Sequence, residues 1–136
     1  MPGKAPDPIE RRRILIVEDD ELMRIFYERL FKRHEGEFIW HLPPSAEEAL
    51  EHLRACEVDA AILDWDLPGI NGLQLLKAIR ANPATKALPV LMVSGRTSPD
   101  YEALALKHGA SGYLAKPFET EKLLAYLRGF RRRHGG

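Results

Sequence analysis

Three stretches of four residues each are apolar without a break, and they limit the folds open to this chain. They lie at 14–17, 60–63 and 90–93. A strand with one face in solvent alternates apolar and polar residues, whereas a strand covered on both faces is apolar throughout. The three runs therefore predict a parallel sheet covered on both sides. Two weaker runs, at 111–115 and 38–40, extend it, and the short second run suits an edge.

Segments with helical spacing separate these runs. Ser45 with Glu48 forms a capping box, and Ser98 before Pro99 fits a helix start. Strand and helix thus alternate five times, which predicts a doubly wound α/β domain with helices on both faces. The apolar positions that share one face of a helix are Leu22, Ile25, Phe26 and Leu30; Ala46, Ala49, Leu50 and Leu53; Gly72, Leu75, Leu76 and Ile79; and Leu123, Leu124, Leu127 and Phe130.

Length and composition narrow the class of protein. The chain has 136 residues, which suits one domain, and its 20 basic and 20 acidic residues cancel. Charge therefore favours neither nucleic acid nor membrane as a partner of this domain. The single cysteine, no signal-peptide core and no apolar stretch near ~20 residues favour a cytoplasmic protein. We expect a flexible leader at 1–12, the domain at 13–130, and a basic tail at 131–136.

Polar residues follow the predicted strands at the point where each one ends. Glu18 and Asp19 follow the first run, Asp64 the third strand, Ser94 the fourth and Lys116 the fifth. Ligands of such sheets bind at the carboxyl ends of the strands, so these groups should converge. Any one of them alone is better explained as an ordinary surface residue. The whole set at matching strand ends is not explained in this way. Three carboxylates held close together repel one another, and a fold tolerates them when a divalent cation such as Mg²⁺ neutralises their charge.

The same group of residues suits phosphoryl transfer. The Asp64 carboxylate can act as a nucleophile and form an aspartyl-phosphate. Lys116 and Ser94 would bind the remaining phosphoryl oxygens, because catalysis of this reaction is mostly positioning and charge neutralisation. A cis bond between Lys116 and Pro117 would aim the lysine inward. The set lacks a strong base to activate water, so a phosphorylated state would last long enough to act as a signal.

Four segments of the chain resemble the receiver domain of two-component response regulators. The resemblance runs from about residue 13 to residue 127, and the segments lie at 14–20, 63–72, 89–95 and 109–118. It implies a flavodoxin-like (βα)5 fold with a five-stranded parallel sheet in the order 2-1-3-4-5. It also implies a phosphoacceptor that takes its phosphoryl group from a histidine kinase or a histidine phosphotransfer protein. Such a domain is a signalling receiver and not an enzyme, since it catalyses only its own phosphorylation and slow dephosphorylation.

The resemblance gives roles to the residues around the metal. Asp64 corresponds to the phosphoacceptor and Asp19 to the direct ligand of Mg²⁺ or Mn²⁺, with Glu18 as the outer acidic partner. The backbone carbonyl of Asp66 would complete the protein's share of the ligands. Lys116 corresponds to the lysine that binds the phosphoryl group.

The resemblance also implies a switch. Ser94 corresponds to the switch hydroxyl, and Tyr113 to an aromatic side chain that moves inward when the hydroxyl turns toward the phosphoryl group. The expected result is a changed surface on the fourth helix, fifth strand and fifth helix, where a downstream protein partner or a second copy would bind. In this family, side chains two residues after the phosphoacceptor and after the switch hydroxyl affect dephosphorylation. Here they are Asp66 and Arg96, and we predict that they pair and restrict water.

Two other functions deserve comparison. The segment 64–66 matches the start of the Asp-x-Asp motif of haloacid-dehalogenase-type phosphatases, but it follows the third strand, and Pro68 replaces the expected Thr or Val. A flavodoxin-like flavin carrier needs a Ser/Thr/Gly-rich phosphate loop after the first strand, where this chain has acidic residues that would repel the flavin phosphate. The sequence leaves open whether the domain acts alone or is part of a larger regulator or hybrid kinase.

Overall fold

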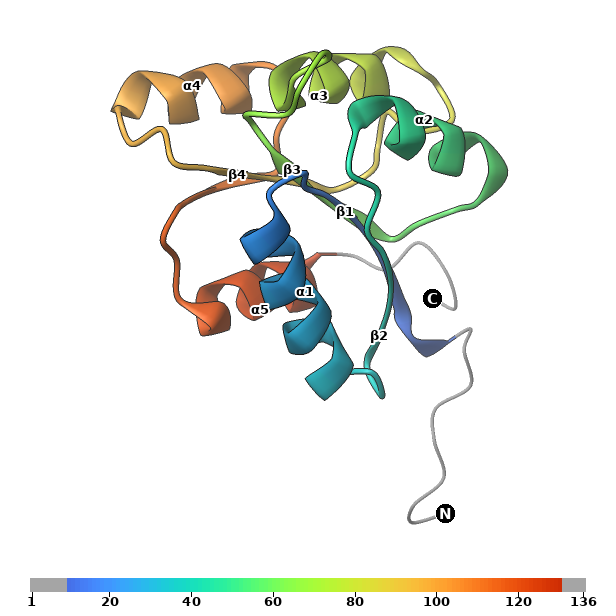
Figure 1. The fold of residues 1–136 in the computed structure, drawn as a ribbon. Coiled ribbons are helices and arrows are strands. Elements are labelled where there is room, and N and C mark those ends of the chain that lie inside the picture. The colour runs from blue at the N-terminus through green and yellow to red at the C-terminus, as the bar shows by residue number, and fades with distance from the viewer. Residues whose placement is uncertain (1–9, 131–136) are drawn as a thin grey trace.

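Strands and helices alternate along the chain in a computed structural model that describes residues 10–130 (Figure 1). Most of the expected leader and the whole basic tail at 131–136 lie outside the described residues, so these boundaries stay predictions. The elements are β1 (Arg12–Val17), α1 (Glu21–Arg33), β2 (Phe38–His41), α2 (Ala46–Ala55), β3 (Ala60–Asp64), α3 (Gly72–Ala81), β4 (Val90–Ser94), α4 (Pro99–Lys107), β5 (Gly112–Ala115) and α5 (Thr120–Gly129).

The five strands form one parallel sheet in the order β2-β1-β3-β4-β5, which confirms the predicted order. Its register pairs Val17 with Leu63 and Ser94 with Ala115. The strands therefore end at nearly the same level, and the residues that follow them meet at one edge. Helices α1 and α5 cover one face of the sheet, and α2, α3 and α4 cover the other (Figure 1).

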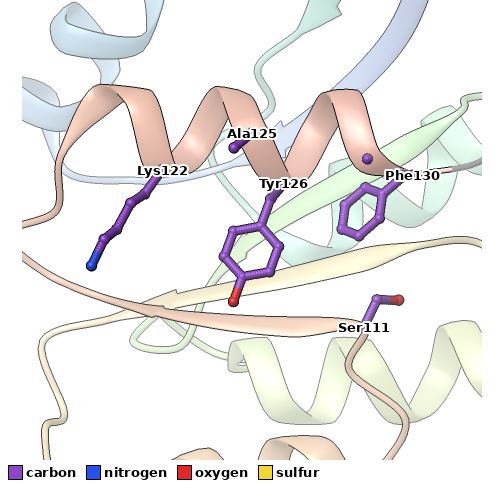
Figure 2. Close-up of a pocket in the computed structure, with 6 residues that line it drawn as sticks. Ser111, Lys122, Ala125, Tyr126 and Phe130 are labelled. Carbon is purple, nitrogen blue, oxygen red and sulfur yellow. The ribbon is translucent and has the colours of Figure 1, made fainter.

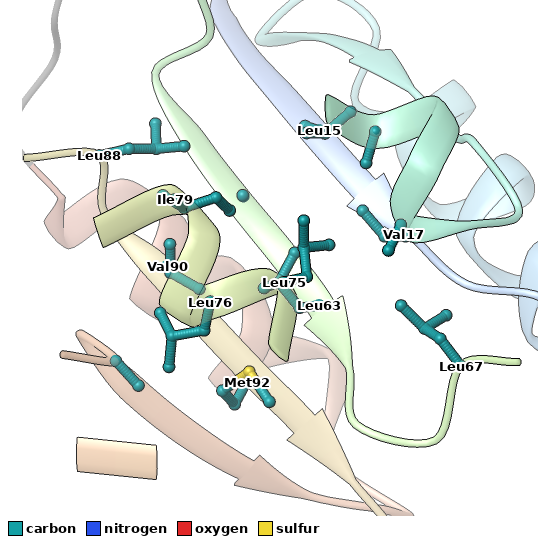
Figure 3. Close-up of a cluster of buried hydrophobic side chains, with 14 of the residues drawn as sticks. Leu15, Val17, Leu63, Leu67, Leu75, Leu76, Ile79, Leu88, Val90 and Met92 are labelled. Carbon is teal, nitrogen blue, oxygen red and sulfur yellow. The ribbon is translucent and has the colours of Figure 1, made fainter. Parts of the chain in front are cut away.

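Alternate residues of each central strand enter two separate cores. Leu15 and Val17 of β1 pack toward α2 and α3 in the cluster shown in Figure 3. Ile14 and Ile16 pack on the opposite face, toward α1 and α5. All four side chains are almost fully buried, because both faces of the sheet are covered. The continuous apolar runs of the sequence are thus explained by two cores rather than one.

Local turns fix the loops at the functional edge. The Asp20 side chain accepts a hydrogen bond from the Met23 amide and caps α1, directly after the acidic pair. Asn71 and Gln74 form a reciprocal capping box at the start of α3. Gly72, which directly follows Asn71, must lack a side chain. A Cβ atom there would overlap the backbone carbonyl of Asp64. The chain after β3 is therefore pressed closely against the start of α3.

Candidate phosphorylation site

Three carboxylates meet at the carboxyl edge of the sheet. Ligand oxygens of Glu18, Asp19 and Asp64 all lie within 4.8 Å of one another. Glu18 and Asp64 are buried, at 1% and 6% exposure, while Asp19 is exposed. Glu18 is fixed by its backbone amide, which donates to the carbonyl of Pro43 in the loop after β2. Two carboxylates thus sit inside the fold, and the third faces solvent above them.

Lys116 supplies the opposite charge. Its Nζ donates to Glu18 Oε1 and to Asp64 Oδ1, at 3.1 Å in each case. Its backbone amide donates to the carbonyl of Ser94, which continues the pairing of β5 with β4. The bond to Pro117 is cis, as considered from the sequence. The structure therefore brings together four of the residues predicted for the site.

The charges in this cluster do not balance. Burial raises the pKa of Glu18 above its ordinary value and the nearby Asp64 adds to this, while the Asp20 amide and Lys116 oppose it. Burial by itself would lower the pKa of Lys116, but Glu18 and Asp64 raise it overall, so the ammonium stays charged. The cluster has three carboxylates, and two of them, those of Glu18 and Asp64, contact this one ammonium. The excess of negative charge, presented by oxygen atoms only, suits a hard divalent cation such as Mg²⁺.

The two predicted switch residues are tied to the same loop. Ser94 is fully buried, and its Oγ accepts a hydrogen bond of 2.9 Å from the backbone amide of Arg96. The Tyr113 hydroxyl donates to the backbone carbonyl of Arg96 at 2.5 Å. The Tyr113 ring is half-buried and stands edge-on to Trp65, with 6.4 Å between the ring centroids. Both side chains therefore contact the chain segment that leaves β4.

The predicted pair between Asp66 and Arg96 is confirmed. Arg96 Nη2 and Nε lie 2.6 and 3.1 Å from Asp66 Oδ1. The Asp66 side chain thus points to Arg96, and the role of its backbone carbonyl as a metal ligand stays a prediction. The Arg96 guanidinium also lies over the rings of Trp65 and Tyr101. These two aromatic neighbours of Arg96 were not predicted from the sequence. Tyr101 occupies the first turn of a helix, a position that carries no sequence signal of such a contact.

The comparison with known families agrees with this geometry. Residues 14–128 match the model of the response regulator receiver domain. The chain belongs to this family. Receiver domains are signalling modules of two-component systems, and this membership does not favour the haloacid-dehalogenase alternative.

Relatives of this receiver domain occur in proteins of different length. It is 34% identical over 121 residues to the phosphate regulon transcriptional regulatory protein PhoB of Rhizobium meliloti, covering 89% of this chain and 52% of that protein. It is 36% identical over 111 residues to the chemotaxis protein CheY of Pseudomonas aeruginosa, covering 82% and 89%. The chain spans about half the length of the first of these.

Solved structures show the same fold. A chemotaxis response regulator of Vibrio cholerae superposes with a TM-score of 0.78 at 28% identity, covering 87% of this chain and 97% of the other. Among residues 10–130, no helix of the receiver domain is long and apolar enough to cross a lipid bilayer.

Replacing Glu18 with Gln should change stability and metal binding in opposite directions. Without divalent cations, we expect the free energy of unfolding at pH 7 to rise by about 1 kcal/mol, because a buried charge beside Asp64 is removed. Affinity for Mg²⁺ should fall by about tenfold, since one of the acidic groups is lost. Urea unfolding at increasing Mg²⁺ concentrations measures both effects.

The pH dependence gives a second check on this variant. A carboxyl with a raised pKa in the folded state binds its proton more tightly there, so protonation of Glu18 as pH falls stabilises the wild type. The Gln variant lacks this gain and should show a flatter stability profile below pH 7. Glu51→Gln, at an exposed position of α2, is the control and should change neither quantity. A loss of stability in Glu18→Gln without Mg²⁺ would refute the repulsion.

Proposed function

We propose that this receiver domain accepts a phosphoryl group on Asp64 and thereby changes its partner-binding surface. The observation that carries the proposal is the position of the Asp64 carboxylate, which is buried close to Glu18 and Asp19 and pairs with the ammonium of Lys116. A carboxylate in this setting is shielded from bulk water yet has a cation beside it to receive phosphoryl oxygens.

In the proposed reaction, a carboxylate oxygen of Asp64 bonds to phosphorus while the bond from phosphorus to the donor's histidine nitrogen breaks. The electron pair of that bond returns to the nitrogen. Lys116 already donates a hydrogen bond to Asp64 Oδ1. It therefore holds the carboxylate in place and is near enough to donate to a phosphoryl oxygen. The Ser94 hydroxyl would turn from the Arg96 amide to donate to another phosphoryl oxygen.

Mg²⁺ or Mn²⁺, held by Asp19, Asp64, the Asp66 carbonyl and, through water, Glu18, would supply charge neutralisation for the phosphoryl group. The fit rests on the shared location of the acidic oxygens and on the all-oxygen character of the donor set. The chain's own share of the work is to hold these carboxylates together at the cost of their mutual repulsion.

We further propose that the donor is a histidine kinase or histidine phosphotransfer protein in the cytoplasm, with the receiver domain spanning 13–130. The downstream partner, or a second copy, would bind the face made by α4, β5 and α5. This face has a hollow of about 430 Å³ lined by α5, by the residue after it and by Ser111, which directly precedes β5 (Figure 2). Its lining residues are Ser111, Lys122, Ala125, Tyr126, Gly129 and Phe130.

The direct test uses acetyl phosphate as a small donor. The purified domain is incubated with acetyl phosphate and Mg²⁺, and its intact mass is measured. We expect the mass of one phosphoryl group to be added, to vanish when EDTA is included from the start, and to be removed by hydroxylamine, which cleaves acyl phosphates. If the domain is folded and binds Mg²⁺ but gains no phosphoryl group from acetyl phosphate, the proposal is refuted.

The pair between Asp66 and Arg96 should lengthen the life of the phosphorylated state. Removing the guanidinium in Arg96→Ala deletes an exposed ion pair with Asp66 and the contacts with two aromatic rings. We therefore expect hydrolysis about fivefold faster, because water reaches the phosphorus more easily. The rate of hydrolysis is measured from the decay of the phosphorylated mass after acetyl phosphate is removed. Arg128→Ala, which breaks a pair with Glu37 elsewhere on the surface, is the control. Equal half-lives in Arg96→Ala and wild type would discard the idea.

A further inference from the structure

The side chain of Arg96 connects two elements that are separate in sequence. On one side it pairs with Asp66, in the loop after β3. On the other, its Nη1 donates to the Tyr101 hydroxyl of α4 at 3.2 Å. The guanidinium carbon lies 5.8 Å from the ring centroid of Trp65 and 5.0 Å from that of Tyr101. These distances are within the range of cation–π attraction. A single planar group thus joins the β3–α3 loop to α4.

The backbone of the same residue contacts both proposed switch side chains. Its amide donates to Ser94 Oγ, and its carbonyl accepts from the Tyr113 hydroxyl. The position of Arg96 therefore affects the groups that respond to phosphorylation as well as the groups that cover the site. Whatever holds the Arg96 side chain also influences the segment that carries Ser94.

Helix α4 buries few of its side chains in the domain. Of its nine residues, only Ala105 is buried. Leu104 and Leu106 are exposed, at 36% and 46%. An alanine offers little apolar area, so burial contributes little to holding this helix. Tyr101 is half-buried and packs edge-on against Trp65, with 5.4 Å between the ring centroids. Trp65 directly follows Asp64, so Tyr101 links α4 to the phosphorylation site.

We infer that Tyr101 is a positioning residue of the phosphorylation site, which holds Arg96 over Trp65 and Asp66 and makes α4 the element that closes the site. This rests on the proposed function, because the site that is closed is the one at Asp64. Movement of α4 away from the sheet withdraws Tyr101 and frees Arg96. Water then bonds to phosphorus, the bond from phosphorus to the Asp64 oxygen breaks, and inorganic phosphate leaves while the carboxylate keeps the electron pair. A partner that holds α4 in place slows this loss, because it keeps Tyr101 against Arg96.

A mutant cycle tests whether Tyr101 acts through Arg96. Half-lives of the phosphorylated domain are measured for Tyr101→Ala, Arg96→Ala and the double variant. We expect Tyr101→Ala to shorten the half-life about threefold, in keeping with the size of one cation–π contact. The double variant should match Arg96→Ala alone, because a contact that acts through Arg96 has no effect once Arg96 is absent. Tyr101→Phe keeps the ring over Arg96 and should change the half-life by less than about twofold.

The control is Leu106→Ala, an exposed substitution on the same helix, which should leave the half-life unchanged. An unchanged half-life in Tyr101→Ala, or a double variant whose effect is the product of the two single effects, would overturn the inference.

The same set of variants is also compared in the unphosphorylated domain, by acrylamide quenching of Trp65 emission in a Trp40→Phe background. There the inference requires that Tyr101→Ala have a smaller effect in the Arg96→Ala background than in the wild type, because Tyr101 also covers Trp65 directly and that part of its effect does not depend on Arg96. If the wild type fails to take up a phosphoryl group, the proposed function fails, and the Trp65 cycle still decides the role of Tyr101.

Discussion

Asp64→Asn should leave the domain folded and abolish its phosphoryl adduct. The amide has nearly the same shape as the carboxylate, but its oxygen carries no charge and its nitrogen is not nucleophilic. The loss should therefore be complete within the detection limit of intact-mass measurement with acetyl phosphate and Mg²⁺. Unfolding in the absence of divalent cations should need more urea than in the wild type, because a buried charge beside Glu18 disappears.

Asp66→Asn is the matched control for this prediction. It makes the same chemical change two residues away, but the Asp66 side chain faces Arg96 and is half exposed. Its amount of adduct should equal that of the wild type, although the adduct should decay faster, as in Arg96→Ala. An adduct that persists in Asp64→Asn, or is lost in Asp66→Asn, would place the phosphoacceptor elsewhere.

The sheet and the charged site could be predicted because backbone geometry alone brings them about. Continuous apolar runs at 14–17, 60–63 and 90–93 require a sheet covered on both faces. In a parallel sheet the strands then end at one edge, so the residues that follow them must meet. The prediction that Glu18, Asp64 and Lys116 converge needed no knowledge of side-chain conformations, and the distances of 3.1 Å around Lys116 agree with it.

The contacts around Arg96 are of another kind. Their geometry depends on how two loops and the start of α4 pack, and neither periodicity nor strand order determines that. The pair with Asp66 was expected only from the family resemblance. The ring of Tyr101 could equally have faced solvent, since an aromatic residue in the first turn of a helix has no required partner. Its position is set by packing against Trp65, which is buried and meets the Tyr101 ring in a T-shaped contact.

Lys116→Met should produce the largest loss of stability among the variants of this site. The side chain is only 23% exposed, and its removal leaves Glu18 and Asp64 buried without a cation. Breaking a buried ion pair by removing one partner costs about 3 kcal/mol, and we expect a loss of that order in the free energy of unfolding at pH 7. Urea unfolding in the presence of EDTA measures it. Lys122→Met, at an exposed position on α5, should change little.

The dependence of this loss on conditions separates charge from packing. In the wild type, Glu18 and Asp64 hold the pKa of Lys116 above its ordinary value, so its contribution is present at neutral pH and is lost only as pH rises through that raised pKa. In the Met variant the pKa of Glu18 should rise further, because an opposing cation is gone. Its stability should therefore recover as pH falls from 7 toward 5, and Mg²⁺ should restore part of it at pH 7. If the deficit were the same at every pH and every Mg²⁺ concentration, lost packing of the lysine stem would be its cause, and the electrostatic account of the whole site would fail with it.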